Sequence, residues 1–341
     1  MIQNPIHYKN FDSQRRFGVE LELGDDVKKK AVHIAITEAS SRKVFVSKYA
    51  LTSNNQYWHV KDDATCGRKG RFGPKGVEVA SFIGSGSSDL DHISDIAVHL
   101  SKLGCKTNDN CGLHIHAEVI DLTVEQISTI VAYWVKVEHV LSMILPIRRY
   151  HSDYCKFIFS PFLHAVNKNS TIYRQQRYSS DEFWRIVSPK NFSLFENNDR
   201  RYNLNLVNVA RSLENNSQYR KTIELRWPEG TLDPIDIKCW VRLFISFIET
   251  CKDKRMPENL QSFTLREAIE YFGVGHSKNK FLILCAELHE MKTWFCERII
   301  KFSQDSSAYY SHYMTSKFQA DTVIEAKKIL NEMWSPIKTF A

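Results

Sequence analysis

The sequence predicts an α+β fold in which a mostly antiparallel sheet carries helices on one face. Three observations predict it: short strand-like segments recur through residues 1–230, turns or long helices join them, and residues 231–341 are almost entirely helical in pattern. The 341 residues are enough for one large domain or two modest ones. With 43% hydrophobic and 25% charged residues, the composition is that of a globular protein and excludes a disordered or fibrous one.

The individual elements follow from periodicity and from capping residues. In the predicted strands, β-branched or aromatic residues alternate with polar ones; these segments are residues 15–23, 57–61, 76–82, 112–119, 202–209 and 220–227. The predicted helices have apolar residues at helical spacing and several stop at Gly or Pro; they are residues 28–42, 87–103, 123–145, 234–252, 264–272, 279–302 and 321–333.

Two segments suggest how the chain is divided. Residues 150–201 show no clear period, so we expect an irregular insertion of the kind that often carries substrate contacts. Residues 251–258 interrupt the helical pattern, so we place a boundary after residue 252. We expect residues 253–341 to form a helical C-terminal subdomain packed on residues 1–252.

Charge and cysteine content restrict the partners and the compartment. The chain has 46 Lys and Arg against 39 Asp and Glu, and this net charge of +7 permits a nucleotide ligand without requiring one. No apolar run approaches the roughly 18 residues of a membrane helix, and the polar N-terminus does not resemble a secretory signal. The eight cysteines include no CxxC pair. We therefore expect a cytoplasmic protein with no membrane contact and no disulfide framework.

One face of four predicted strands carries nearly all of their charge. Residues two apart on a strand share a face, so Glu20 and Glu22 lie opposite Val19 and Leu21. The other three strands repeat this division between an apolar and a polar face. If the strands are neighbours, the polar face gathers Glu20, Glu22, Glu78, His114, His116, Glu224 and Arg226.

Such a group of carboxylates would repel one another strongly unless cations or protons were bound among them. Oxygen ligands with an occasional imidazole suit Mg²⁺, or Mn²⁺, better than a metal that prefers thiolate. Each motif alone also has an ordinary interpretation: ExE as a solvated strand face, HxH as satisfied polar structure, and ExR as a cross-strand ion pair. Their occurrence together favours a shared site for metal and phosphate.

The series FGVELEL, WHVKDDAT, GVEVAS, NDNCGLHIHA, ILPIRRYHSDYC, RYNLNL and TIELRWPEGTLD, which spans roughly residues 15–250, resembles the putative amidoligase family. That family is similar to the catalytic domains of glutamine synthetase and glutamate–cysteine ligase. The resemblance implies that residues 1–252 form a curved half-barrel whose concave face binds ATP and two or three Mg²⁺ ions. It also implies an ATP-dependent ligase that joins a carboxylate to an amine through an acyl phosphate.

The resemblance further assigns roles to individual residues. It implies that the metal ligands are Glu20, Glu22, Glu78, His114 and Glu224. His116 would be either a further ligand or a residue that orients the ligands without binding the metal. Arg226 would contact the transferred phosphoryl group, and either Arg148 or Arg149 would bind phosphate. Asn205 belongs to a motif of the family, and we place it with the residues that bind the nucleotide.

Two features of the sequence leave alternatives open. The family usually has Asp-Gly-Ser where this chain has Asp62-Asp63-Ala64-Thr65, so either aspartate is a candidate for the base that accepts the proton of the amine. The loop at residues 67–76 contains four basic residues, including Lys75, and reads either as a flexible hairpin connection or as a lid over a phosphate.

The resemblance implies a carboxylate substrate and an amine acceptor, the latter an amino acid, peptide, protein or small metabolite. Free ammonia is not the expected acceptor, because the elements that capture ammonia in glutamine synthetase are not recognisable. A guanidine or amine kinase on the same fold is one alternative. A zinc-dependent enzyme is another, with Cys105, Cys111, His114 and His116 as ligands. Nucleic acid is disfavoured as a partner because acidic residues interleave with the basic ones. A homo-oligomer is compatible with the sequence, although no ring-forming segment is recognisable.

Overall fold

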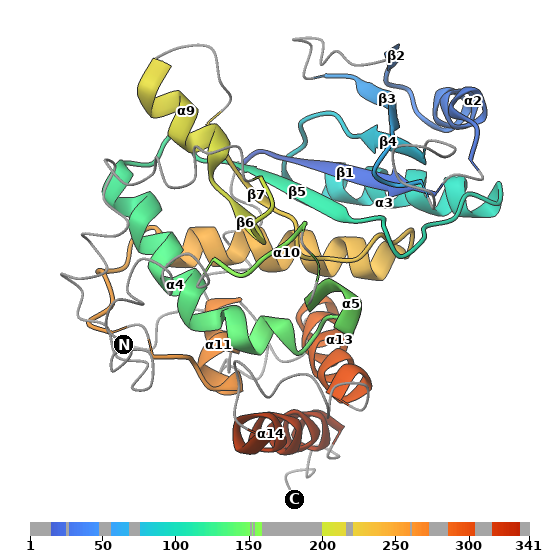
Figure 1. The fold of residues 1–341 in the computed structure, drawn as a ribbon. Helices are drawn as coiled ribbons and strands as arrows, with labels where there is room; N and C mark the ends of the chain where they lie inside the picture. The colour runs from blue at the N-terminus through green and yellow to red at the C-terminus, as the bar shows by residue number, and fades with distance from the viewer. Residues whose placement is uncertain are drawn as a thin grey trace, which may run out of the picture.

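The computed structural model describes residues 15–24, 27–47, 56–67, 76–150, 152, 154–158, 200–215, 221–259, 261–272, 286–303 and 316–334. In these ranges the chain forms one open sheet of seven strands with helices packed against it (Figure 1). The predicted α+β class and the mostly antiparallel sheet are therefore confirmed.

The strand order places the four charged strands side by side. The order is β2-β3-β4-β1-β5-β7-β6, and all neighbours are antiparallel except β2 and β3. The strands are β1 (Phe17–Leu23), β2 (Val44–Ser47), β3 (Trp58–Asp63), β4 (Gly76–Ala80), β5 (Leu113–Glu118), β6 (Leu204–Asn205) and β7 (Thr222–Leu225).

The pairing register aligns the polar positions across these strands. Glu22 of β1 lies opposite Glu78 of β4, and Glu20 lies opposite His114 of β5. On the other edge of β5, His116 lies opposite Glu224 of β7. Residues directly opposite each other project to the same face of a sheet, so this register alone brings carboxylates and imidazoles together.

The helices bury the apolar face of the sheet. They are α2 (Lys29–Ala39), α3 (Gly86–Lys102), α4 (Val124–Ser142), α5 (Ile147–Tyr150), α9 (Val207–Asn215), α10 (Pro234–Cys251), α11 (Leu265–Tyr271), α13 (Ala286–Ser303) and α14 (Ser316–Trp334). Helices α3 and α10 run beneath the sheet, while α11, α13 and α14 lie farther from it, beyond α10 (Figure 1). None of the described helices combines the length and hydropathy that a membrane span requires.

Local sequence explains where two long helices of the core, α4 and α10, begin. Thr123 starts α4 with a capping box, since its hydroxyl accepts from Gln126 N and the Gln126 side chain accepts from Thr123 N. Asp233 caps α10 by accepting from Ile235 N at 2.8 Å, and Pro234 occupies the first helical position, where no backbone donor is needed.

The hydrophobic core extends from the sheet into the C-terminal helices. Phe17 and Leu21 of β1 are buried in the same cluster as Phe247 of α10, Phe295 of α13 and Ile329 of α14. Burial of apolar surface is the main favourable contribution to folding, so residues after α10 contribute to the stability of the part that carries the sheet. The boundary after residue 252 stays a prediction.

Some predicted elements differ from the structure. Strand β2 was not predicted, and the expected strand at 202–209 is a strand only at Leu204–Asn205, because helix α9 begins at Val207. The Asn205 side chain accepts a hydrogen bond from Val207 N at 2.9 Å, which starts this helix. Most of the insertion at 150–201, and residues 279–285 of a predicted helix, lie outside the described residues.

Candidate active site

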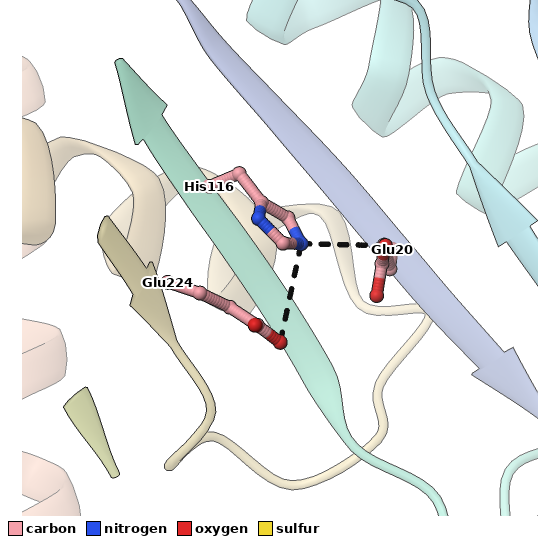
Figure 2. Close-up of side chains that lie close together, drawn as sticks. All are labelled: Glu20, His116 and Glu224. Carbon is pink, nitrogen blue, oxygen red and sulfur yellow. Dashed lines mark ion pairs between the residues drawn. The ribbon is translucent and has the colours of Figure 1, made fainter. Parts of the chain in front are cut away.

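The polar side chains of β1, β4, β5 and β7 meet on the face of the sheet opposite its buried apolar residues. We call Glu20, Glu22, Glu78, His114, His116 and Glu224 the acid face. His116 Nε2 lies 3.3 Å from Glu20 Oε1 and 3.9 Å from Glu224 Oε1 (Figure 2). One ligand atom from each of these three side chains lies within 4.8 Å of the other two, which is close enough to share a cation.

His114 joins the carboxylates of two strands. Its Nδ1 lies 3.3 Å from Glu20 Oε2 and 3.9 Å from Glu224 Oε1, while its Nε2 lies 3.6 Å from Glu22 Oε1. The side chain is only 5% exposed, so the imidazole is held in one place between three acidic groups. The structure thus brings together the two histidines and three of the four glutamates that the sequence suggested.

The fourth glutamate has a partner that the sequence analysis missed. Glu78 Oε1 lies 2.6 Å from Lys61 Nζ of the neighbouring strand β3. Lys61 lies opposite Glu78 in the register of β3 and β4. The sequence does contain a pattern that indicates this partner. His59, Lys61 and Asp63 occupy alternate positions and give β3 a polar face like that of the other strands.

Glu224 is fixed by two side chains besides the histidines. Arg226 forms an ion pair with Glu224 Oε1, and Asn205 Nδ2 donates to Glu224 Oε2 at 2.6 Å. Because the Asn205 carbonyl oxygen also accepts from Val207 N, both polar ends of Asn205 are engaged within the protein. This geometry makes Asn205 a residue that orients Glu224.

The two candidate arginines occupy different environments. Arg149 is buried, and its guanidinium donates to the carbonyl oxygens of Trp227 at 3.1 Å and Arg226 at 2.5 Å. Arg148 is half-exposed and pairs with Asp109 at 2.8 Å. Arg149 is therefore the arginine that lies beside the acid face, where it holds the backbone of Arg226.

The two candidate aspartates point to opposite sides of β3. Asp62 Oδ2 binds Lys29 Nζ of α2 at 2.8 Å, away from the acid face. Asp63 lies on the same side as Lys61, and its Oδ1 accepts from Thr65 N at 2.7 Å. Lys75 and the rest of the basic segment at 68–75 lie outside the described residues.

Electrostatics divide Glu20, Glu224 and Glu78 into two kinds of carboxylate. Burial would raise the pKa of Glu20, but the imidazoles of His116 and His114 outweigh it and hold the pKa well below its ordinary value. Burial also opposes ionisation of Glu224, yet Arg226 and His116 lower its pKa. Burial and the nearby charges of Glu20 and Glu22 instead raise the pKa of Glu78 well above its ordinary value, despite Lys61.

These observations fit a divalent cation of the Mg²⁺ class. Four carboxylates and two imidazoles supply hard oxygen donors with nitrogen, and no thiol belongs to the acid face. Burial and the charges of Glu20 and Glu22 raise the pKa of Glu78 in spite of Lys61, so this part of the acid face disfavours a further negative charge. A cation among these groups would supply the missing positive charge.

The zinc ligands considered from the sequence do not form one cluster. His116 lies between Glu20 and Glu224, while Cys111 contacts Cys66. Cys105 lies elsewhere, in a cavity between the end of α3 and the start of α10. In the described part of the chain, the clusters suited to a metal are Glu20–His116–Glu224 and Glu22–Asp63–Cys66.

Comparison with known families identifies the family of the chain. Residues 13–248 match a family model described as "Putative amidoligase enzyme", which covers more than half of the chain. The chain therefore belongs to this amidoligase family, whose description indicates a ligase. No curated protein matches the chain.

Proposed function

We propose that this protein is an ATP-dependent carboxylate–amine ligase that forms an amide or isopeptide bond through an acyl phosphate. The observation that carries the proposal is the convergence of four carboxylates, two imidazoles and Arg226 on one face of four adjacent strands. Membership of the amidoligase family supports the ligase class. The proposal includes the curved sheet of a glutamine synthetase-like fold as the support of this face.

The first step requires charge to be balanced on a triphosphate. Mg²⁺ ions bound at the acid face would neutralise the charge of the phosphate oxygens. The residues that would hold these ions are Glu20, Glu22, Glu78, His114 and Glu224. His114 and His116 hold Glu20 and Glu224 as ionised ligands, since their imidazoles favour the charged carboxylates. Asn205 fixes the second oxygen of Glu224, so the ligand geometry exists before substrate binds.

Arg226 is suited to contact the transferred phosphoryl group. Its side chain is 20% exposed, and its Nε has no hydrogen-bond partner among the described residues. Arg149 binds the carbonyl oxygen of Arg226 and so fixes the point from which the side chain extends. A guanidinium placed in this way provides fixed positive charge where negative charge develops on the phosphoryl oxygens.

The second step joins the amine to the activated carboxylate. The amine attacks the acyl carbon, the C–O bond to phosphate breaks, and phosphate leaves with the bonding electrons. The amine must also lose a proton. Of the two aspartates suggested by the sequence, only Asp63 lies on the same side of the sheet as the acid face.

The test is release of ADP and phosphate from Mg²⁺–ATP in the presence of pooled amino acids, polyamines and peptides. We expect Glu20→Gln to lower turnover by roughly 100-fold or more, because it removes a ligand charge without changing side-chain volume. The matched control is Glu38→Gln, which alters an exposed glutamate of α2 and should leave turnover unchanged.

The products distinguish the ligase from the kinase alternative. A new amide together with free phosphate supports the ligase, whereas a stable phosphorylated acceptor identifies a kinase on the same fold. Equal ADP release from Glu20→Gln and the unchanged protein would show that the acid face does not carry the reaction.

A further inference from the structure

A second group of potential metal ligands lies at one end of the sheet. One ligand atom each from Glu22, Asp63 and Cys66 lies within 4.8 Å of the other two. The thiol of Cys111 contacts that of Cys66. We call Glu22, Asp63, Cys66 and Cys111 the thiol cluster.

The topology explains why these four residues meet. Strands β1 and β3 end at Leu23 and Asp63, and their antiparallel neighbours β5 and β4 begin at the same end of the sheet (Figure 1). Cys66 follows β3, and Cys111 lies two residues before β5. Strand pairing therefore places residues that are far apart in the sequence at one end of the sheet.

Backbone contacts hold the two cysteine segments together. Asn108 Nδ2 donates to the carbonyl oxygen of Cys66 at 2.7 Å, and Asn110 Nδ2 donates to that of Gly67 at 3.1 Å. Asn108 N also donates to Cys111 Sγ at 3.4 Å. The two thiols are thus positioned by amides of the same loop, before any ligand binds.

Glycines make room for both cysteines. A Cβ atom at Gly76 would overlap Cys66 Cβ, and one at Gly230 would lie 2.5 Å from Cys111 Cβ. Any larger residue at either position would displace the cysteine beside it. The two glycines therefore let each cysteine approach the neighbouring backbone closely.

The charges in this cluster are unbalanced. Cys66 and Cys111 are buried, Glu22 is 6% exposed, and the leading charges acting on both thiols are those of Glu22 and Asp63. A disulfide between the cysteines would leave two carboxylates facing an apolar bond. A divalent cation instead compensates carboxylates and thiolates at once.

We propose that Glu22, Asp63, Cys66 and Cys111 form a second metal site, for a zinc-class cation, separate from the acid face but sharing Glu22 with it. Two sulfur and two oxygen donors suit Zn²⁺, which accepts both and prefers four ligands in a tetrahedron. Ligand atoms around such an ion lie about 3.5 Å apart. Glu22, Asp63 and Cys66 already bring one ligand atom each within 4.8 Å of the other two, and Cys111 would complete the set through its contact with Cys66.

The role that follows is structural. Glu22 Oε1 faces His114 at 3.6 Å, and Glu22 Oε2 accepts from Gly112 N at 2.5 Å, so Glu22 connects the two sites. A cation in the thiol cluster would fix the ends of β1, β3 and β5, from which the acid face extends. This inference rests on contacts of the thiol cluster and does not require the proposed ligase activity.

The test is Co²⁺ titration of the metal-free, fully reduced protein, followed by its near-ultraviolet absorption. A sulfur-to-cobalt charge-transfer band should appear with one equivalent and should disappear when Zn²⁺ is added. Cys66→Ser and Cys111→Ser should each weaken Co²⁺ binding by roughly 100-fold or more. Cys105→Ser is the matched control, since this nearby cysteine lies outside the cluster, and it should retain the band.

The acid face contains no sulfur, so Co²⁺ bound there gives no such band. Glu20→Gln should therefore abolish turnover and keep the band, which separates failure of this inference from failure of the proposed function. Asp63→Asn, which retains the hydrogen bond to Thr65, should weaken binding in a protein that folds normally. A missing band, a band retained in Cys66→Ser, or a Cys66–Cys111 disulfide in the isolated protein would each overturn the assignment.

Discussion

At the scale of single residues, Glu78 shows how the acid face differs from an ordinary strand surface. It is buried, faces Glu22 across β1 and β4, and has Lys61 as its cationic partner. Burial, together with the charges of Glu20 and Glu22, outweighs Lys61 and raises the pKa of Glu78 well above its ordinary value of 4.5. Burial of like charges at this position lowers the stability of the protein and is typical of functional sites.

This imbalance predicts a pH dependence that one substitution removes. Above pH 4.5 the unfolded chain releases the Glu78 proton while the folded chain retains it, so stability falls as pH rises from 4.5 towards the raised pKa. Glu78→Gln mimics the protonated form. In a chelator at neutral pH, we expect it to be more stable than the unchanged protein by on the order of 1 kcal/mol.

Thermal unfolding between pH 4.5 and 8 measures this effect. As pH rises, the melting temperature of Glu78→Gln should fall less steeply than that of the unchanged protein. Adding Mg²⁺ should then stabilise the unchanged protein more than the variant, because ligand binding adds to stability only where the site is complete. A lower melting temperature for Glu78→Gln across the whole range would contradict the charge balance described here.

At the scale of elements, the start of β5 is tightly packed against side chains of the acid face. A Cβ atom at Gly112 would lie 2.8 Å from His114 Nε2 and 3.2 Å from Arg149 Nη2. Gly112 N also donates to Glu22. The absence of a side chain at this position therefore lets a histidine, an arginine and a carboxylate approach the same peptide.

Gly112→Ala should consequently disturb the site more than the fold. We expect ATP turnover to fall by roughly 10-fold or more, since small displacements of catalytic groups are costly, with a modest loss of stability. Gly18→Ala is the matched control, because Gly18 lies on the same face in β1 and its Cβ would meet nothing within 4 Å. Turnover assays compare the activity of the two variants, and circular dichroism checks that both are folded. Equal activity of Gly112→Ala and Gly18→Ala would contradict this prediction.

The elements also show what the sequence could predict. Alternation along β1, β5 and β7 correctly placed Glu20, His114 and Glu224 on one face, because the side-chain period of a strand is a local property. The pairing of Lys61 with Glu78, and the approach of Cys66 to Cys111, depend on which strands are neighbours and in what register. Those are set by hydrogen bonds between distant segments, which no local pattern encodes.

The missed elements have similar causes. Strand β2 has only four residues, all at least partly exposed, so it lacks the alternation of apolar and polar residues that identifies a strand. In the segment predicted as a strand at 202–209, Leu204 and Leu206 do alternate with polar residues, but the Asn205 side chain starts helix α9 instead. Capping by a side chain overrode strand propensity at this point.

At the scale of the whole molecule, the C-terminal helices are connected to the site. Arg298 of α13 forms ion pairs with Glu229 and with Asp236, the latter at 3.0 Å, and donates to the Ile144 carbonyl oxygen at 2.9 Å. The segment around Glu229 is bonded to the start of β5, since Gly230 N donates to Cys111 O at 2.8 Å. A helix distant in sequence thus supports the loop beneath both proposed sites.

This connection predicts different consequences for two arginines that each bind two carboxylates. The Arg298 side chain is 8% exposed, so Arg298→Met leaves Glu229 and Asp236 with uncompensated charge and should lower the free energy of unfolding by about 3 kcal/mol. Arg266 of α11 pairs with Glu325 and Glu332, but its side chain is 35% exposed. Arg266→Met should therefore cost about 1 kcal/mol or less, because water solvates the carboxylates that remain.

Urea denaturation of both variants measures this difference, and turnover shows whether it reaches the site. We expect Arg298→Met to lower turnover even where the protein is still folded, since the segment at Glu229 would no longer be fixed beneath Gly112. Adding Glu229→Gln to Arg298→Met should restore part of the stability by removing the unpaired charge. If the two arginine variants were equally stable, the buried ion pairs of Arg298 would contribute no more to stability than the exposed pairs of Arg266.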